Sequence, residues 1–120
     1  MKPPKIFRVE TVNDTLVVSP LREVTSLAEG EVQQELEGIV AHLEKPDITH
    51  LVIDFAEVAY FGSSMLEAMR MLARRLRDGE GKMALCNAST VVREILHITR
   101  FDTKWPTYDS RDAALAAVHA

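Results

Sequence analysis

Two adjacent serines, Ser63 and Ser64, are the residues of this chain best placed for chemistry. They stand in the segment VAYFGSSMLEAM, residues 58–69, where an apolar run ends at Gly62 and a helical pattern begins. Ser64 and Glu67 have the Ser-x-x-Glu spacing of a capping box, which predicts that Ser64 caps the helix. Ser63 is expected just ahead of that helix, where free amides and the helix dipole favour a phosphate. The pattern leaves Ser63 as either a plain surface serine or a modification site.

The serine pair does not fit a serine hydrolase. The nucleophile elbow of that class needs Gly-x-Ser-x-Gly, and no glycine stands on the far side of the pair. His97 ends a predicted helix and His119 adjoins the last residue, so neither has an evident triad role. The sequence also has no P-loop and no Gly-x-Gly-x-x-Gly motif, so we expect neither serine catalysis nor nucleotide binding.

Cysteine and histidine usage gives no sign of a metal or redox site. Cys86 is the single cysteine, which excludes an intramolecular disulfide, and its strand context predicts a buried thiol. The four histidines share no metal-ligand spacing. We therefore expect no metal site and no cofactor.

Asp54 ends the apolar run HLVID and has two interpretations. It stands where a two-component receiver carries its phosphoacceptor aspartate, or it is a turn ligand where a strand exits. A receiver also needs an acidic pair at the end of its first strand, followed directly by a helix. This chain offers Glu10 alone there and continues into a hairpin, which favours the turn ligand.

Arginines recur on one face of the helix that follows the serines. Arg70, Arg74, Arg75 and Arg77 share this face with Glu67. Such a face is either solvated and supported by pairs three and four residues apart, or a contact for an acidic partner surface. The spacing leaves both interpretations open.

The bulk composition is that of one ordinary globular domain. The chain has 120 residues, of which 47% are hydrophobic and 27% charged. Its formal net charge of -4 argues against a dedicated nucleic-acid binder. The N-terminus has no apolar signal region, and no run approaches membrane-spanning length. We expect a cytoplasmic protein.

The hydrophobic pattern predicts an α/β domain with the order β-β-α-β-α-β-α-β-α. The short turn at 13–14 requires the first two strands to pair antiparallel, and the later alternation predicts parallel crossovers. A capping box at Ser26 and Glu29 is expected to open the first helix. Pro106 favours a sheet edge or a bulge for the last strand. The result is a mixed sheet of about five strands with about four helices. The strands are expected at 6–12, 15–19, 50–55, 82–87 and 104–108, and the helices after 26, 63, 89 and 109.

The residues from HLVIDFAEVAYFGSSMLEAM and from GKMALCNASTVVREILHITRFDTKWPTYDSRDAAL together resemble a known family. They are similar to the STAS domain of anti-sigma-factor antagonists, over nearly the whole chain. The resemblance implies a single STAS domain over residues 1–120, with residues 1–4 as a disordered tail. It also implies a strand ending in Asp and a phosphoacceptor serine before the second helix.

The family's site usually reads Asp-Ser-[Ser/Thr]-Gly-[Leu/Val], with the first Ser or Thr phosphorylated. Carried over by position, this resemblance makes Ser63 the acceptor and keeps Ser64. Gly62 replaces the Asp, which removes an acidic group beside the acceptor. Met65 replaces the Gly, and a bulky side chain there is expected to hold a partner's backbone away.

The resemblance implies a non-enzymatic regulatory module that binds an anti-sigma factor with an ATPase-type kinase fold. Unphosphorylated protein would bind it and free the sigma factor, and a phosphate on Ser63 would break the complex. Tyr60 and Phe61 are expected either to be exposed anchors or to pack under the helix. The alternatives are a STAS adaptor subunit of a larger signalling or transport assembly without a phosphate cycle, and a small enzyme or receiver that uses Asp54. The residues expected to contact the partner are Tyr60, Phe61, Gly62, Ser64, Met65, Glu67, Arg70 and Arg74.

Overall fold

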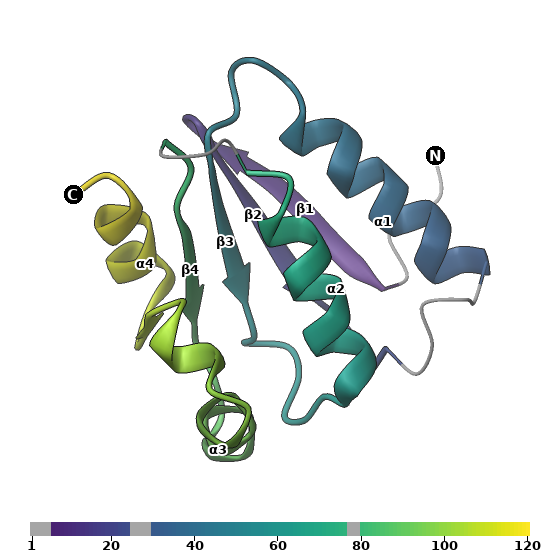
Figure 1. Cartoon of the computed structure of the whole chain (residues 1–120), viewed down its shortest axis with the longest axis vertical. Helices are drawn as coiled ribbons and strands as arrows, with labels where there is room; N and C mark the ends of the chain where they lie inside the picture. The colour runs from purple at the N-terminus through teal and green to yellow at the C-terminus, as the bar shows by residue number, and fades with distance from the viewer. Residues whose placement is uncertain (1–5, 25–29, 77–79) are drawn as a thin grey trace.

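The chain forms one α/β layer structure, with the predicted element order (Figure 1). A computed structural model describes residues 6–24, 30–76 and 80–120. The predicted tail at 1–4 and the capping box at Ser26 and Glu29 lie outside these ranges. The elements are β1 (Phe7–Val12), β2 (Thr15–Pro20), α1 (Gly30–Leu43), β3 (His50–Asp54), α2 (Ser63–Ala73), β4 (Met83–Cys86), α3 (Thr90–Ile98), the 3-10 turn η1 (Phe101–Thr103), β5 (Thr107–Tyr108) and α4 (Arg111–Val118).

The five strands form one mixed sheet in the order β1-β2-β3-β4-β5. β1 and β2 pair antiparallel, and the other neighbours pair parallel, as predicted. Asn13 makes the tight turn between β1 and β2 with a positive φ of 55°, which asparagine tolerates better than most residues. β5 is confirmed as an edge strand, and it is shorter than predicted because only Thr107 and Tyr108 pair with β4.

Alternate residues of the central strands pack into two cores on the two faces of the sheet. The larger core joins residues such as Leu16, Leu51 and Leu85 to α1, α2 and α3. The smaller core lies under α4, which covers β3, β4 and β5 on the other face. Because both faces are covered there, β3 and β4 are buried throughout, which explains their continuous apolar sequences.

Helix caps follow the sequence in two places. The Ser89 hydroxyl accepts a hydrogen bond from the Val92 amide and caps α3. The Ser110 hydroxyl accepts one from the Ala113 amide and caps α4.

Parallel strands bring their carboxyl ends to one edge of the sheet. β3 ends there at Asp54 and β4 at Cys86, and the segments that follow lead into α2 and α3. The serine pair and Asp54 therefore lie toward the same end of the molecule, where ligands and partners of open α/β sheets are usually met.

Candidate functional site

The first turn of α2 forms the centre of the candidate site. α2 begins at Ser63, and Gly62 is its N-cap, with extended backbone angles and no side-chain cap hydrogen bond. The prediction that Ser64 caps the helix is therefore wrong: Ser64 is already the second helical residue. Glycine is itself an accepted N-cap, and the helix begins two residues earlier than a cap at Ser64 would place it. Ser63 is exposed at the positive end of the helix.

Phe61 and Met65 were expected on the contact surface, but both are core residues. Each is only 1% exposed, and the Phe61 ring lies 5.3 Å from that of Phe55 between ring centres. Neither side chain can touch a partner directly in this conformation. For Phe61 the alternative of packing under the helix is the one observed. The expected steric role of Met65 is also corrected, since its side chain points into the core and not toward a partner.

Tyr60 is the exposed aromatic residue of the loop. Its side chain is 51% exposed, next to buried Phe61. The Ser89 hydroxyl donates a hydrogen bond of 2.8 Å to the Ala59 carbonyl, which ties the loop to the start of α3. The loop before Ser63 therefore presents Tyr60 outward from an anchored backbone.

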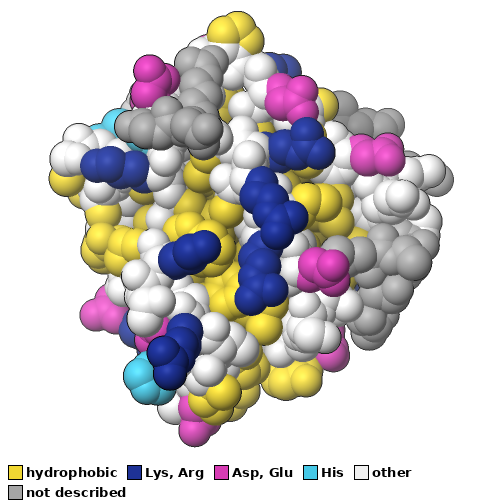
Figure 2. Space-filling model, viewed as in Figure 1, with side chains coloured by type: hydrophobic (Ala, Val, Ile, Leu, Met, Phe, Trp, Pro, Cys, Tyr) yellow, Lys and Arg dark blue, Asp and Glu magenta, His cyan; other side chains and the backbone are white. Residues whose placement is uncertain are grey.

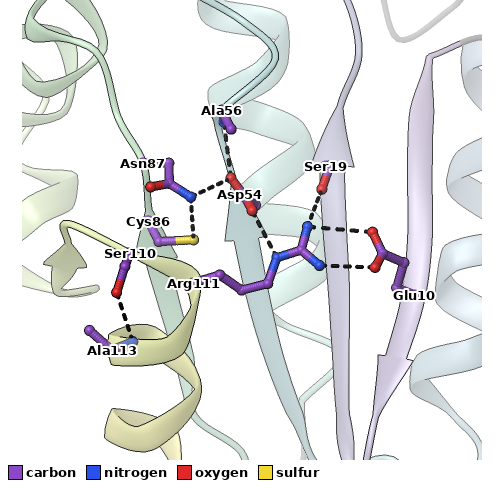
Figure 3. Close-up of polar contacts among 9 residues, drawn as sticks. All are labelled: Glu10, Ser19, Asp54, Ala56, Cys86, Asn87, Ser110, Arg111 and Ala113. Carbon is purple, nitrogen blue, oxygen red and sulfur yellow. Dashed lines mark hydrogen bonds and ion pairs between the residues drawn. The ribbon is translucent and has the colours of Figure 1, made fainter.

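Asp54 anchors the beginning of the same loop (Figure 3). One of its carboxylate oxygens accepts from the Ala56 amide at 3.0 Å and from the Asn87 side chain at 3.1 Å. The other accepts from Nε of Arg111 at 2.9 Å. Burial alone would raise the pKa of Asp54, but the hydrogen bonds from Asn87, Ala56 and Arg111 outweigh it and lower the pKa. This is the predicted turn ligand, because a carboxylate so fully engaged and 3% exposed is a poor phosphoacceptor.

Arg111 extends this network across the sheet to β1. Its guanidinium donates to Glu10 at 2.9 and 3.4 Å and lies 3.5 Å from the Ser19 hydroxyl. The first turn of α4 is thereby linked to the ends of three strands. The sequence did not reveal this role, because Arg111 lies 57 positions from Asp54 and 101 from Glu10.

Cys86 is buried, as predicted. Burial, with a further contribution from the Asp54 carboxylate, raises the pKa of its thiol to about 12. The thiolate is the reactive form of cysteine, so this residue is a structural hydrophobe and not a nucleophile.

The expected contact residues Glu67, Arg70 and Arg74 are all exposed on the outer side of α2. The Arg70 guanidinium lies over the Phe101 ring, 5.0 Å from its centre. Arg75 points the other way. Its guanidinium lies 3.6 Å from a carboxylate oxygen of Glu44, the residue that follows α1. The described arginines of this segment thus divide between two sides, and Arg70 and Arg74 share theirs with Ser63. Arg77 lies outside the described residues.

A second polar cluster, absent from the sequence prediction, joins Asp14, His50 and His119. It draws on the turn after β1, the start of β3 and the end of α4, and its ligand-type atoms lie within 4.8 Å of one another. Nε2 of His119 contacts one Asp14 oxygen, and Nε2 of His50 lies 3.7 Å from the other. Long sequence separation hid the cluster, since the histidine spacing along the chain carries no signal of it.

The hydrogen bonds of this cluster disfavour a metal ion at Nε2 of His50. The Lys82 amide donates to Nδ1 of His50 at 3.1 Å, so the ring proton of neutral His50 lies on Nε2, facing Asp14. A metal at Nε2 needs the opposite tautomer. The pKa of His119 is raised, chiefly because His119 forms a hydrogen bond with Asp14. The pKa of His50 is lowered, chiefly because the ring is buried.

Comparison with known proteins identifies the class of this domain. Residues 7–114 match the family model of the STAS domain, so the chain belongs to the STAS domain family. A curated relative from Bordetella bronchiseptica, BtrV, described as a candidate anti-sigma factor antagonist, is 32% identical over 104 residues, which is 87% of each chain.

Two solved structures agree with this assignment. An anti-sigma-factor antagonist (STAS) domain protein from Planctomyces limnophilus is 29% identical, with a TM-score of 0.80 over 97% of this chain and 100% of that one. An anti-sigma factor antagonist from Mycobacterium paratuberculosis is 26% identical, with a TM-score of 0.78 over 99% and 98%. Among the described residues, no helix has both the length and the apolar character needed to cross a bilayer.

Proposed function

We propose that this protein is a non-enzymatic regulatory module of the cytoplasm that acts as an anti-sigma factor antagonist. Three proteins to which this chain is similar carry that description. The observation that carries the proposal is the exposed Ser63 at the start of α2, beside the outward-facing Tyr60. The partner would be an anti-sigma factor with an ATPase-type kinase fold, and the antagonist would release the sigma factor by binding it.

The contact surface consists of the loop before α2 and the outer side of that helix. Its exposed or half-buried members are Tyr60, Gly62, Ser63, Ser64, Glu67, Arg70 and Arg74. Phe61 and Met65 support this surface from below. Tyr60 is the aromatic anchor, because a large exposed ring on a tied loop loses little freedom on binding.

Ser63 is the proposed phosphorylation site and the switch of this contact. A phosphate there would carry about -1.5 to -2 charges and would lie at the positive end of the α2 dipole. The helix start therefore tolerates the phosphate, while the same charge on the docked surface opposes binding. Buried Met65 supports this proposal, because no side chain at position 65 stands over the acceptor.

The residues with nucleophilic or acid–base character near the site support a binding role. Cys86 has a strongly raised thiol pKa, and Asp54 is committed to three hydrogen-bond donors. We therefore propose no catalytic step and no cofactor for this domain.

A STAS adaptor subunit without a phosphate cycle is the second candidate. Gly62 favours it, because the acidic residue that precedes the acceptor in the family pattern is missing. In that case the same surface would hold a permanent neighbour in a signalling or transport assembly.

Co-purification from the source cell separates the two candidates. Tagged wild-type protein, Ser63→Ala and the adjacent control Ser64→Ala are recovered, and bound proteins and phosphate are identified by mass spectrometry. The switch predicts an ATPase-fold kinase and a phosphate that disappears only in Ser63→Ala. A stable complex without phosphate under any growth condition refutes the switch and supports the adaptor.

A further inference from the structure

A groove runs along α2 on the same side as Ser63. At one end it is lined by Ser63 and Leu66 of α2 together with Thr99 and Phe101. It continues between the end of α2 and the segment from Thr99 to Trp105, as a hollow of about 760 Å³. Figure 2 shows Lys and Arg side chains in a row across this face, over apolar surface.

Cations without carboxylate partners line the groove. Within the described part of the chain, Arg70, Arg74, Arg100 and Lys104 are all exposed and form no ion pair. Arginines elsewhere in the described chain do form ion pairs. The Arg93 guanidinium, for example, lies 2.7 Å from a carboxylate oxygen of Asp109. A net charge of -4 for the whole chain makes this positive groove contrast with the rest of the molecule.

The floor of the groove is aromatic. The rings of Phe101 and Trp105 lie 5.0 Å apart between centres, and Trp105 is half-buried. Arg70 lies over the first ring, and Lys104 lies 5.8 Å from the centre of the second. The cations are therefore held over apolar surface, where they are partly shielded from water.

Arg100 occupies a backbone conformation that favours glycine. It precedes η1 with φ 62° and ψ 21°, in the left-handed region. A residue with a Cβ costs roughly 1 kcal/mol there relative to glycine. Backbone strain of this kind is often associated with function, and here it brings a cation to the rim of the groove.

We propose that this groove binds an acidic amphipathic helix of a partner protein, whose apolar side packs on half-buried Trp105 and whose carboxylates pair with Arg70, Arg74, Arg100 and Lys104. The proposal rests on the proposed function, in that the protein acts by binding a partner, and it adds the chemistry of the bound segment. Charge complementarity selects an acidic segment, and the apolar floor selects a helix with one apolar side.

Direct binding of a defined probe tests this groove. The probe is a fluorescein-labelled synthetic amphipathic helix with Leu on one side and Glu flanking it, and its control has every Glu replaced by Gln. Trp105 is the only tryptophan and lies in the groove, so its fluorescence reports binding there. We expect the Glu peptide to bind wild-type protein about tenfold more tightly than the Gln peptide, and less tightly as salt rises.

Variants then locate the bound peptide. Arg74→Glu and Arg100→Gly are each expected to weaken binding about tenfold. Arg100→Gly keeps or raises the melting temperature, because glycine relieves the left-handed backbone. Arg75→Glu is the matched control, since Arg75 pairs with Glu44 and does not line the groove; it should leave the affinity within about twofold.

Three results overturn the groove proposal: equal affinity for both peptides, equal loss with Arg75→Glu, or tighter binding of an oligonucleotide or of anionic phosphatidylserine vesicles. The same variants are tested on the partner recovered in the Ser63 experiment. If Tyr60→Ser abolishes that partner's binding while Arg74→Glu and Arg100→Gly do not, the groove proposal fails and the proposed function stands. If no partner is recovered, the proposed function fails and the peptide titration still decides the groove.

Discussion

Replacing Arg111 by methionine is expected to destabilise the domain and loosen the loop that leads to Ser63. Methionine keeps most of the apolar volume of the arginine stem and removes its charge. The variant leaves the second Asp54 oxygen without the donor that lies 2.9 Å away in the native protein. It also removes both hydrogen bonds to Glu10.

The magnitude follows from how deeply each partner lies. The Asp54 side chain is 5% exposed, so loss of its cation leaves a buried charge, which typically costs about 3–5 kcal/mol. Ala56 and Asn87 still donate to the other oxygen, and water reaches the half-buried Arg111 position, which reduces the cost. We expect a loss of about 2–3 kcal/mol, close to that of one charged hydrogen bond. Glu10→Gln, with Glu10 38% exposed, should cost about 1 kcal/mol or less.

Urea unfolding followed by Trp105 fluorescence measures these losses. Arg93→Met is the matched control, because its ion pair with Asp109 is exposed, and it should cost less than about 1 kcal/mol. Hydrogen exchange of the Ala56 amide should become faster in Arg111→Met, since the carboxylate that accepts its hydrogen bond is no longer fixed.

The acid limb of stability gives a second readout. The lowered pKa of Asp54 means that its contribution is present above the unfolded value near 3.8 and is lost as pH falls through the folded pKa. Without Arg111 the folded pKa of Asp54 moves up toward its unfolded value, so this acid-induced loss of stability should be smaller. If Arg111→Met is as stable as Arg93→Met and shows an unchanged acid limb, the network does not anchor the loop and the reasoning is refuted.

Three further predictions concern other parts of the molecule. The pKa of His119 is raised chiefly by its hydrogen bond to Asp14, so its stabilisation is present below pH 6.5 and is lost as pH rises through the folded value. His119→Gln should therefore lower the unfolding free energy in mildly acidic buffer and have little effect in alkaline buffer; equal effects at both would contradict the cluster. Cys86 should react with a thiol reagent only on unfolding, because of its burial and its raised pKa, and rapid labelling of native protein would contradict this. Met65→Ala should cost about 2–4 kcal/mol, measured by urea unfolding, because it leaves a cavity under α2, whereas an exposed Met65 would cost almost nothing.

The order of strands and helices could be predicted because local patterns determine it. The continuous apolar run before Asp54 reports a strand that is covered on both faces. Asn13 and Asp14 require a tight antiparallel turn. Serines before α3 and α4 mark helix starts, and both hydroxyls make the cap hydrogen bonds.

The start of α2 was misplaced by two residues because two N-caps, Gly62 and Ser64, compete there. Glycine and serine are both accepted caps, and the Ser64–Glu67 spacing pointed to the second. A signal for the correct phase was present: Met65, Ala68, Met69 and Leu72 recur at helical spacing, and all four are buried. This apolar periodicity, given more weight than the Ser64–Glu67 spacing, predicts that Met65 lies in the core.

The side-chain networks could not be predicted because they join distant parts of the chain. Arg111 reaches Glu10 over 101 positions, and His119 reaches Asp14 over 105. No local periodicity links such residues, since their proximity depends on sheet order and on where α4 packs. The groove cation Arg100 was missed for a related reason: its place depends on a left-handed backbone that the residue type disfavours.

The most direct test of the proposed function is one titration. The anti-sigma factor recovered with the protein is titrated, by calorimetry, with unmodified protein and with protein carrying phosphoserine incorporated at position 63. Our account predicts binding of the unmodified form and at least about tenfold weaker binding of the phosphorylated form, a difference of about 1.4 kcal/mol. Equal affinities would contradict the proposed switch at Ser63, and binding of neither form would contradict the partner contact itself.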